Sequence, residues 1–269
     1  MSRNPVTRRQ FLTLPVRLLL TMPLAAVAPW AAVSAQPEPR RGTYAVDVAL
    51  LYGALSLQLT GTTDESIDRA AGRYHVQAIG QGSRLANRVE SSGVLKDGRW
   101  APLQATSWFK VAGRESQATI TYDYDSRTIR YQFRGETFFL RRLRVADDVV
   151  AMPDARVDDT FSALLNYADD RWPQEPDGAF RTLIVRRQRP AREGPDDVQQ
   201  TYRAELVPFV LKVTADSQTG RATALFDLTR FSSWARDDRP AEIVFGPDRR
   251  PESIASSMVL GTSVTIRFT

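Results

Sequence analysis

Apolar and polar residues alternate with a period of two along most of the chain from about residue 43, which is typical of β-strands that bury one face. A first long strand is predicted over residues 43–59, where the apolar face changes parity at Leu51-Tyr52-Gly53. A parity change beside a glycine indicates a β-bulge, and a bulge lets a long strand bend. The pattern therefore favours a strongly curved sheet.

The same alternation predicts a series of further strands. They cover residues 74–78, 88–95, 102–111, 118–124, 129–133, 138–145, 180–187, 201–213, 221–231, 242–245 and 253–269. Lys96-Asp97-Gly98 and Asp125-Ser126-Arg127 are turn sequences that close two hairpins between these strands. The stretch 189–197, rich in proline and charge, is predicted to be an exposed loop.

Residues 161–168 are the exception, because their apolar positions have helical spacing. Asp158 or Asp159 is placed to cap the N-terminus of this helix, which ends by Arg171-Trp172-Pro173. A helix this short is expected to cap or plug the sheet rather than form a layer. We therefore predict a mainly β protein: an antiparallel, strongly curved or barrel-like sheet with one short capping helix, in a single domain over residues 36–269.

The first 35 residues have the features of an export signal. Arg8 and Arg9 lie in the motif Thr7-Arg8-Arg9-Gln10-Phe11-Leu12, which is typical of twin-arginine translocation. An apolar stretch follows over residues 18–33 and ends at Val33-Ser34-Ala35, which predicts cleavage after Ala35. The predicted partners at this stage are the twin-arginine export machinery and signal peptidase, and the predicted location is the periplasm.

Two alternatives to this signal remain open in the sequence. A retained membrane anchor would need about 20 apolar residues in one helix, whereas Pro23 and Pro29 interrupt this stretch. The Sec route is the other alternative, because Arg17 blurs the start of the apolar core.

The charge balance and the absence of cysteine argue against several classes of function. Four of the 36 basic residues and none of the 31 acidic residues lie in the signal, which leaves 32 basic against 31 acidic residues. This near balance gives no global case for nucleic acid or an anionic membrane as partner. The absence of cysteine excludes disulfides, thiol catalysis, cysteine zinc sites and a lipid anchor on cysteine.

Several polar residues are candidates for chemistry, and each has a structural alternative. His75 is the only histidine and could act as a general base, but a surface position is favoured. Asp123 and Asp125 could bind a divalent cation, but Asp125 lies in a predicted turn. No metal site or cofactor is predicted.

Paired acids and clustered arginines recur along the chain. The acid pairs are Asp147-Asp148, Asp158-Asp159, Asp169-Asp170, Asp196-Asp197 and Asp237-Asp238, and all are interpreted as solvated turn or capping residues rather than hydrolase carboxylates. The arginine clusters are Arg141-Arg142-Arg144, Arg186-Arg187-Arg189 and Arg249-Arg250. They could bind phosphate or carboxylate groups of envelope lipids or polysaccharide, but a charged outer strand face balanced by acids is favoured.

Aromatic residues on neighbouring predicted strands are the candidate ligand-binding residues. They are Trp108, Phe109, Tyr122, Tyr131 and Phe133, with Tyr124 beside them. In a filled barrel these side chains form the core, whereas in a wider one they line an apolar pocket able to hold an acyl chain. Core packing is favoured, since sequence does not distinguish a filled interior from an empty one.

A family resemblance rests on short motifs in a fixed order. They are Tyr44-Ala45-Val46-Asp47-Val48 with Tyr52-Gly53, Glu90-Ser91-Ser92-Gly93-Val94-Leu95, Asp97-Gly98, Ala101-Pro102-Leu103, Tyr122-Asp123-Tyr124 and Asp159-Thr160-Phe161-Ser162. In this order the chain resembles the DUF3108 family of exported Gram-negative bacterial proteins, from about residue 41 onward. The C-terminal part fits less closely, around Ser233-Trp234-Ala235-Arg236-Asp237. The resemblance implies an exported antiparallel β-fold, similar to the half-barrels of periplasmic lipoprotein carriers.

We therefore expect a non-enzymatic periplasmic protein that binds an apolar envelope component, such as a lipid, or assists envelope biogenesis through an envelope protein. One alternative is a packed β-scaffold that acts only through protein partners. The other is a carboxylate-dependent hydrolase of envelope polysaccharide, for which no residue pair is nominated.

Overall fold

Strands form nearly all of the secondary structure in the computed structural model, which describes residues 38–269 except 51, 138, 189, 191–192, 195, 216–217, 220, 231–234, 237 and 259–260. The predicted export signal, with Arg8, Arg9 and Ala35, lies outside the described residues. In chain order the strands are β1 (Glu38–Leu50), β2 (Leu55–Asp68), β3 (Arg73–Gln81), β4 (Leu85–Lys96), β5 (Arg99–Val111), β6 (Arg114–Asp123), β7 (Thr128–Glu136), β8 (Leu143–Ala151), β9 (Ala179–Arg187), β10 (Ala204–Ala215), β11 (Ala222–Phe226), β12 (Ala241–Phe245), β13 (Pro251–Ser257) and β14 (Ser263–Phe268). Helix α1 (Thr160–Ala168) lies between β8 and β9 in the chain, and a short 3-10 helix (Leu228–Arg230) follows β11.

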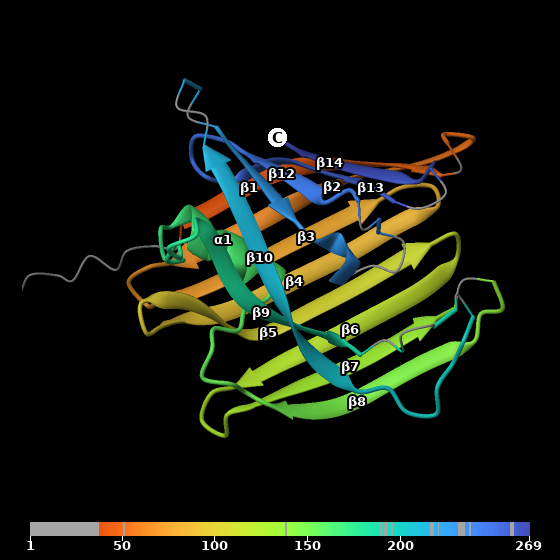
Figure 1. Ribbon diagram of the computed structural model, residues 1–269, viewed down its shortest axis with the longest axis horizontal. Helices are drawn as coiled ribbons and strands as arrows, with labels where there is room; N and C mark the ends of the chain where they lie inside the picture. Colours follow the sequence, from red (N-terminus) through yellow and green to blue (C-terminus); the bar gives the residue numbers. More distant parts are fainter. Residues whose placement is uncertain are drawn as a thin grey trace, which may run out of the picture. The chain divides into compact units, whose positions relative to one another are not determined.

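All fourteen described strands belong to one antiparallel sheet, with the order β8-β7-β6-β5-β4-β3-β2-β1-β14-β13-β12-β11-β10-β9. The sheet curves until its edge strand β8 lies against the start of β10, the strand next to the other edge strand, β9. Ala146 of β8 and Tyr202, just before β10, form an isolated backbone bridge, and the Asp148 carboxylate accepts a hydrogen bond from the Ala204 backbone N–H at 2.8 Å. The predicted fold class, a barrel-like antiparallel sheet with one short helix, is confirmed (Figure 1).

Side chains rather than a continuous backbone ladder close this seam between β8 and β10. The Glu193 carboxylate lies between the Arg187 guanidinium, at 2.6 Å, and that of Arg144 on β8, at 3.7 Å. The Glu193 side chain is only 6% exposed, so the prediction of an exposed loop over 189–197 is wrong at this residue. The Glu193 carboxylate is buried because it neutralises the positive charges of Arg187 and Arg144 on the two sides of the seam.

The predicted bulge at residues 51–53 is wrong, because the chain reverses there. Strands β1 and β2 pair as a hairpin whose last partners are Leu50 and Leu55. Tyr52 and Gly53 have φ angles of 58° and 87°, the left-handed conformation that tight hairpin turns need. The parity change in the sequence therefore marks a turn of even length rather than one inserted residue.

Other strand boundaries also differ from the prediction. The strand expected over 138–145 begins only at Leu143, after a turn at residues 139–140, and Phe138 lies outside the described residues. The single stretch expected over 253–269 is two strands, β13 and β14, paired antiparallel. The stretch expected over 221–231 ends as a strand at Phe226. The hairpin turns at residues 96–98 and 125–127 are confirmed.

Helix α1 lies between the two halves of the closed sheet (Figure 1). On one side Leu165 packs with Tyr74 and Trp100 of β3 and β5. On the other side Ala163 and Tyr167 pack with residues of β9 to β12. The prediction that the helix plugs the sheet is confirmed by these contacts.

Glycines in the strands make room for tyrosine rings on the inner face. A Cβ at Gly93 would lie 2.4 Å from the Tyr74 ring, and one at Gly61 would lie 2.5 Å from the Tyr44 ring. Because glycine carries no side chain, the Tyr74 ring crosses β4 and its hydroxyl comes within 2.9 Å of the Ser91 hydroxyl. This contact leads into the polar cluster at the start of α1.

Candidate functional site

The start of α1 is fixed by a reciprocal pair of hydrogen bonds. The Asp159 carboxylate accepts from the Ser162 backbone N–H at 2.9 Å, and the Ser162 hydroxyl accepts from the Asp159 backbone N–H at 2.9 Å. This is a capping box, which satisfies two of the backbone donors that a helix N-terminus leaves open. The prediction that one of the two aspartates caps the helix is confirmed for Asp159.

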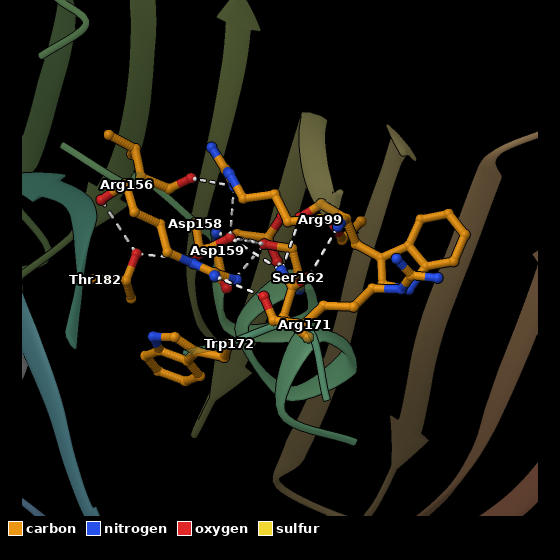
Figure 2. Close-up of polar contacts among 12 residues, drawn as sticks. Arg99, Arg156, Asp158, Asp159, Ser162, Arg171, Trp172 and Thr182 are labelled. Carbon is orange, nitrogen blue, oxygen red and sulfur yellow. Dashed lines mark hydrogen bonds and ion pairs between the residues drawn. The ribbon is translucent and has the colours of Figure 1, made fainter. Parts of the chain in front are cut away.

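The neighbouring Asp158 carboxylate is completely buried and accepts hydrogen bonds from several elements (Figure 2). One of its oxygens lies 3.0 Å from the Arg99 guanidinium of β5 and 3.3 Å from the Asn166 side-chain amide of α1. Its other oxygen accepts from the Thr182 hydroxyl of β9 at 2.7 Å and from Arg156. One carboxylate thus joins α1 to both halves of the sheet.

Further contacts extend this attachment. The Asn166 side chain accepts from the Trp100 backbone N–H and donates to the Trp100 carbonyl, both at 2.8 Å, so it pairs with β5 as a strand would. The Arg156 guanidinium donates to the Arg171 carbonyl at 3.0 Å and lies 5.3 Å from the centre of the Trp172 ring. The segments before and after α1 are therefore bound to each other as well as to the sheet.

Asp159 faces the interior of the sheet and has a perturbed pKa. Its second carboxylate oxygen accepts from the Ser91 hydroxyl at 2.6 Å, and Ser91 in turn contacts Tyr74. Burial raises the pKa of Asp159 to about 6, against the opposing effect of the hydrogen bonds from Ser91 and Ser162. Burial also raises the pKa of Tyr74.

The cluster has little access to solvent. Asp158, Ser162 and Asn166 have exposed fractions of 0%, and Ser91 is 1% exposed. A general acid or base must reach a substrate within hydrogen-bond distance. The geometry instead suits a structural role, in which buried charges paired with arginines hold α1 inside the sheet.

An open hollow of about 520 Å³ lies beside α1. Its apolar lining includes residues of β3, α1 and β14 and two prolines at or near the start of β13: Val76, Phe161, Leu164, Leu165, Phe268, Pro247 and Pro251. Charged side chains also line the hollow: Arg40, Arg41, Glu65, Asp248, Arg250 and Glu252. Ligand pockets combine an apolar lining with a few polar groups in this way, and their volumes run from about 300 to 1,000 Å³.

The charges around the hollow are arranged in pairs. Arg250 donates two hydrogen bonds to the Glu65 carboxylate, at 2.7 and 2.6 Å, and both side chains are less than one-fifth exposed. Burial raises the pKa of Glu65, although Arg250 opposes that shift. Arg40 lies 2.9 Å from Asp248. The hollow therefore offers both donors and acceptors to a polar group, beside an apolar surface.

The predicted ligand-binding aromatics do not line this hollow. Tyr122 and Tyr131 are 3% and 5% exposed and belong to one buried cluster, against which Phe133 packs. The Tyr131 and Phe133 rings stack with centres 6.5 Å apart. These three residues are brought together as core, and their role in ligand binding stays a prediction.

The remaining two aromatics face opposite sides of the sheet. Ala105 packs on the buried cluster, so Phe109, four residues further along β5, lies on the same inner face, with 42% of its surface exposed. Trp108 lies on the outer face, where its Nε1 is 3.4 Å from the Glu115 carboxylate. Adjacent strand residues cannot share a face, and this rule was available from the sequence.

Most other polar candidates have structural partners. The His75 side chain is 47% exposed, with its Nε2 3.8 Å from the Glu90 carboxylate, which confirms a surface position. The Asp123 carboxylate accepts from the backbone N–H groups of Asp125 and Ser126, so it caps the turn. Among the described residues, no cluster of three or more histidines and acids has metal-binding geometry.

The interpretation of the acid pairs as solvated turn or capping residues is confirmed for Asp159 as a helix cap, but two of the pairs depart from it in burial or position. Asp158 and Asp159 are buried, because two arginines and a capping box compensate their charges. Asp147 and Asp148 lie inside β8 rather than at its end, and Asp237 lies outside the described residues. Among the arginines, Arg186 pairs with Glu205, and Arg249 pairs with Asp170.

Comparisons with known proteins identify no family. No family model and no curated protein matches the chain. One similar solved structure is described as a β-barrel-like protein of the domain of unknown function DUF1849 from Brucella abortus. It has 11% identity, a TM-score of 0.36, and coverage of 87% of this chain and 96% of that one. The resemblance to DUF3108 stays a prediction. In the described part of the chain, no helix has the length and hydropathy of a membrane span.

Proposed function

We propose that the protein is a non-enzymatic binding protein of the periplasm that holds an apolar or amphipathic envelope component in the hollow beside α1. The observation that carries this proposal is the hollow itself, with an apolar lining from Val76, Leu164 and Phe268 next to paired charges. The twin-arginine motif supports export, with the translocation machinery and signal peptidase as partners in that step.

The surrounding structure suits binding rather than turnover. Two carboxyls have a pKa that burial raises, Asp159 and Glu65. Asp159 is buried at the N-terminus of α1 and is not part of the lining of the hollow, and Glu65, which does line it, accepts two hydrogen bonds from Arg250. The charged residues of the lining form ion pairs, which can orient a polar head group. A ligand with one apolar chain and a polar end matches this distribution.

Filling the hollow is expected to weaken ligand binding. Leu164 is partly buried and lines the hollow, so Leu164→Trp places a larger side chain there. We expect the wild-type protein to bind a fluorescent fatty acid and L164W to bind it at least about tenfold more weakly, because the apolar contact area is lost. Fluorescence titration measures both affinities, and native mass spectrometry with lipid extraction identifies ligands that co-purify.

The matched control is Leu225→Trp, the same substitution at an exposed position of β11 that does not line the hollow. This variant should bind like the wild-type protein. Equal binding by L164W and L225W would contradict the proposed site. A ligand-free mass together with no fatty-acid binding by the wild-type protein would contradict the function and favour a packed scaffold that acts through protein partners.

A further inference from the structure

The end of the sheet opposite α1 carries an exposed apolar pair next to basic residues. Phe139 and Leu140, in the connection between β7 and β8, are 62% and 60% exposed. The hairpin turns β1–β2, β3–β4, β5–β6 and β7–β8 all lie at this end, because successive antiparallel strands reverse direction (Figure 1). Two large apolar side chains that project together into solvent are a feature of interaction surfaces.

The neighbouring loops are joined to this connection by hydrogen bonds. The Arg141 guanidinium donates to the Gly113 carbonyl of the β5–β6 turn at 3.0 Å, and the Ala112 backbone N–H donates to the Arg84 carbonyl of the β3–β4 loop at 2.8 Å. The three loops therefore form one continuous surface, which we call the loop end: residues 82–85, 110–115, 134–137 and 139–145.

The loop end is strongly basic. Its basic residues are Arg84, Lys110, Arg114, Arg134, Arg141, Arg142 and Arg144, and its acidic residues are Glu115 and Glu136. Glu115 pairs with Lys110, and Glu136 pairs with Arg141. Arg84 and Arg142 are both exposed, and Arg142 interacts electrostatically with Asp196. The surface carries an excess of positive charge although the whole predicted mature chain is nearly neutral.

Two further acids lie against the loop end: Glu193, which is 3.7 Å from Arg144, and Asp196, which has a structural role. The Asp196 carboxylate accepts from the Phe139 and Leu140 backbone N–H groups at 2.9 and 2.7 Å. It holds the backbone so that the two apolar side chains remain exposed. Asp196 offsets one of the excess charges at the loop end, and Glu193, shared between Arg144 and Arg187, offsets part of another, so the surface remains positive.

Trp108 lies between two hollows of the same surface. One hollow, of about 600 Å³, is lined by Arg84, Lys110 and Trp108. The other, of about 240 Å³, is lined by Trp108, Arg134 and Arg141. Tryptophan is enriched where proteins meet the head groups of a bilayer, and arginine and lysine bind phosphate groups.

We propose that the loop end docks the protein on an anionic lipid bilayer, with Phe139 and Leu140 inserted among the acyl chains. The arginines and Lys110 contact lipid phosphates, and Trp108 lies at the head-group level. The charge of the surface is complementary to an anionic membrane, and the apolar pair is placed to enter it. This surface is at the other end of the sheet from the hollow, so the inference stands independently of the proposed ligand.

Vesicle co-sedimentation tests the proposal with two variants of the loop end. The wild-type protein should bind vesicles of phosphatidylethanolamine and phosphatidylglycerol, and more weakly at high salt or on pure phosphatidylcholine. Phe139→Ser with Leu140→Ser should weaken binding at least about tenfold, since the inserted apolar area is lost. Arg141→Gln with Arg142→Gln should weaken binding to the anionic vesicles by roughly fivefold for each charge removed.

Matched controls remove the same chemistry elsewhere. Leu225→Ser removes an exposed apolar residue of β11, and Arg127→Gln with Arg130→Gln removes two exposed charges from the β6–β7 hairpin. All of these variants should bind vesicles as the wild-type protein does. L164W should do so as well, which separates this proposal from the ligand site.

A site-specific probe reports insertion directly and does not depend on how well the serine variants fold. Because the chain contains no cysteine, Leu140→Cys accepts a single environment-sensitive fluorophore, and Leu225→Cys is the control. Anionic vesicles should shift the emission of the probe at residue 140 to the blue and leave that at residue 225 unchanged. No shift at residue 140, or no vesicle binding by the wild-type protein, would overturn the proposal and point to a protein partner at the loop end.

Discussion

Replacing Asp158 by alanine is expected to lower the free energy of unfolding by about 3–5 kcal/mol, the cost of removing one partner from a buried ion pair. The Asp158 carboxylate is fully buried and receives hydrogen bonds from both Arg99 and Arg156. Their side chains are 20% and 15% exposed, so without Asp158 two guanidinium groups would lie together with little water to solvate them. Urea denaturation, followed by circular dichroism, measures the loss.

The control for this prediction is Asp147→Ala on β8. Asp147 also forms an arginine pair, 2.9 Å from Arg130, but both side chains are about half exposed. Exposed pairs contribute little because water and salt screen them, so this variant should unfold close to the wild-type midpoint. Equal losses at Asp158 and Asp147 would mean that the buried cluster does not hold the fold together.

The second large effect is a dependence of stability on pH that originates at Asp159. Burial raises its pKa to about 6 in the folded protein, from an ordinary value of 3.8. Between these values the folded state binds more protons than the unfolded state, so stability falls as pH rises. A difference of roughly two pKa units corresponds to about 3 kcal/mol, present below pH 4 and lost by about pH 6.

Comparison with Asp159→Asn isolates this effect from those of the other acidic groups in the protein. Asparagine is a good N-cap and still accepts from the Ser162 backbone N–H, so the variant should fold. The stability of the wild-type protein relative to D159N should fall between pH 4 and pH 7, as measured by denaturation at each pH. For Asp123→Asn the stability difference should change with pH in the opposite direction, because hydrogen bonds lower the pKa of the exposed Asp123 carboxyl. If the stability difference between the wild-type protein and D159N did not change with pH, that result would contradict the raised pKa of Asp159.

Much of the fold could be predicted because its signals are local. Alternation of apolar residues gave most strands, and the Asp159 cap together with the spacing of Phe161 and Leu165 gave α1. The hairpin at residues 51–53 was missed because an even-length turn and a one-residue bulge produce a similar change of parity. The left-handed conformation of Tyr52, an uncommon residue for it, gave no warning in the sequence.

The candidate sites were harder to predict because their partners are far apart in the chain. Asp158 is 59 residues from Arg99 and 24 from Thr182, and no spacing rule joins them. The hollow is lined by residues from both ends of the domain, such as Arg40 and Phe268. One usable signal was overlooked: Ser162 three residues after Asp159 completes a capping box, which favours a capping rather than a freely solvated acid.

The seam between β8 and β10 has a consequence for how the molecule loses order under native conditions. Neighbouring strands elsewhere in the sheet share backbone ladders. This junction instead has one backbone bridge, and it is otherwise held by side-chain contacts of Asp148, Arg144 and Glu193. Regions held by few backbone hydrogen bonds open at lower free energy than the core. Amide hydrogens of β8 should therefore exchange with deuterated solvent earlier than those of β3 and β4, and Glu193→Gln should accelerate exchange at β8 alone. Transient separation of β8 from β10 would let the barrel-like sheet open at this junction while all the other neighbouring strands stay paired.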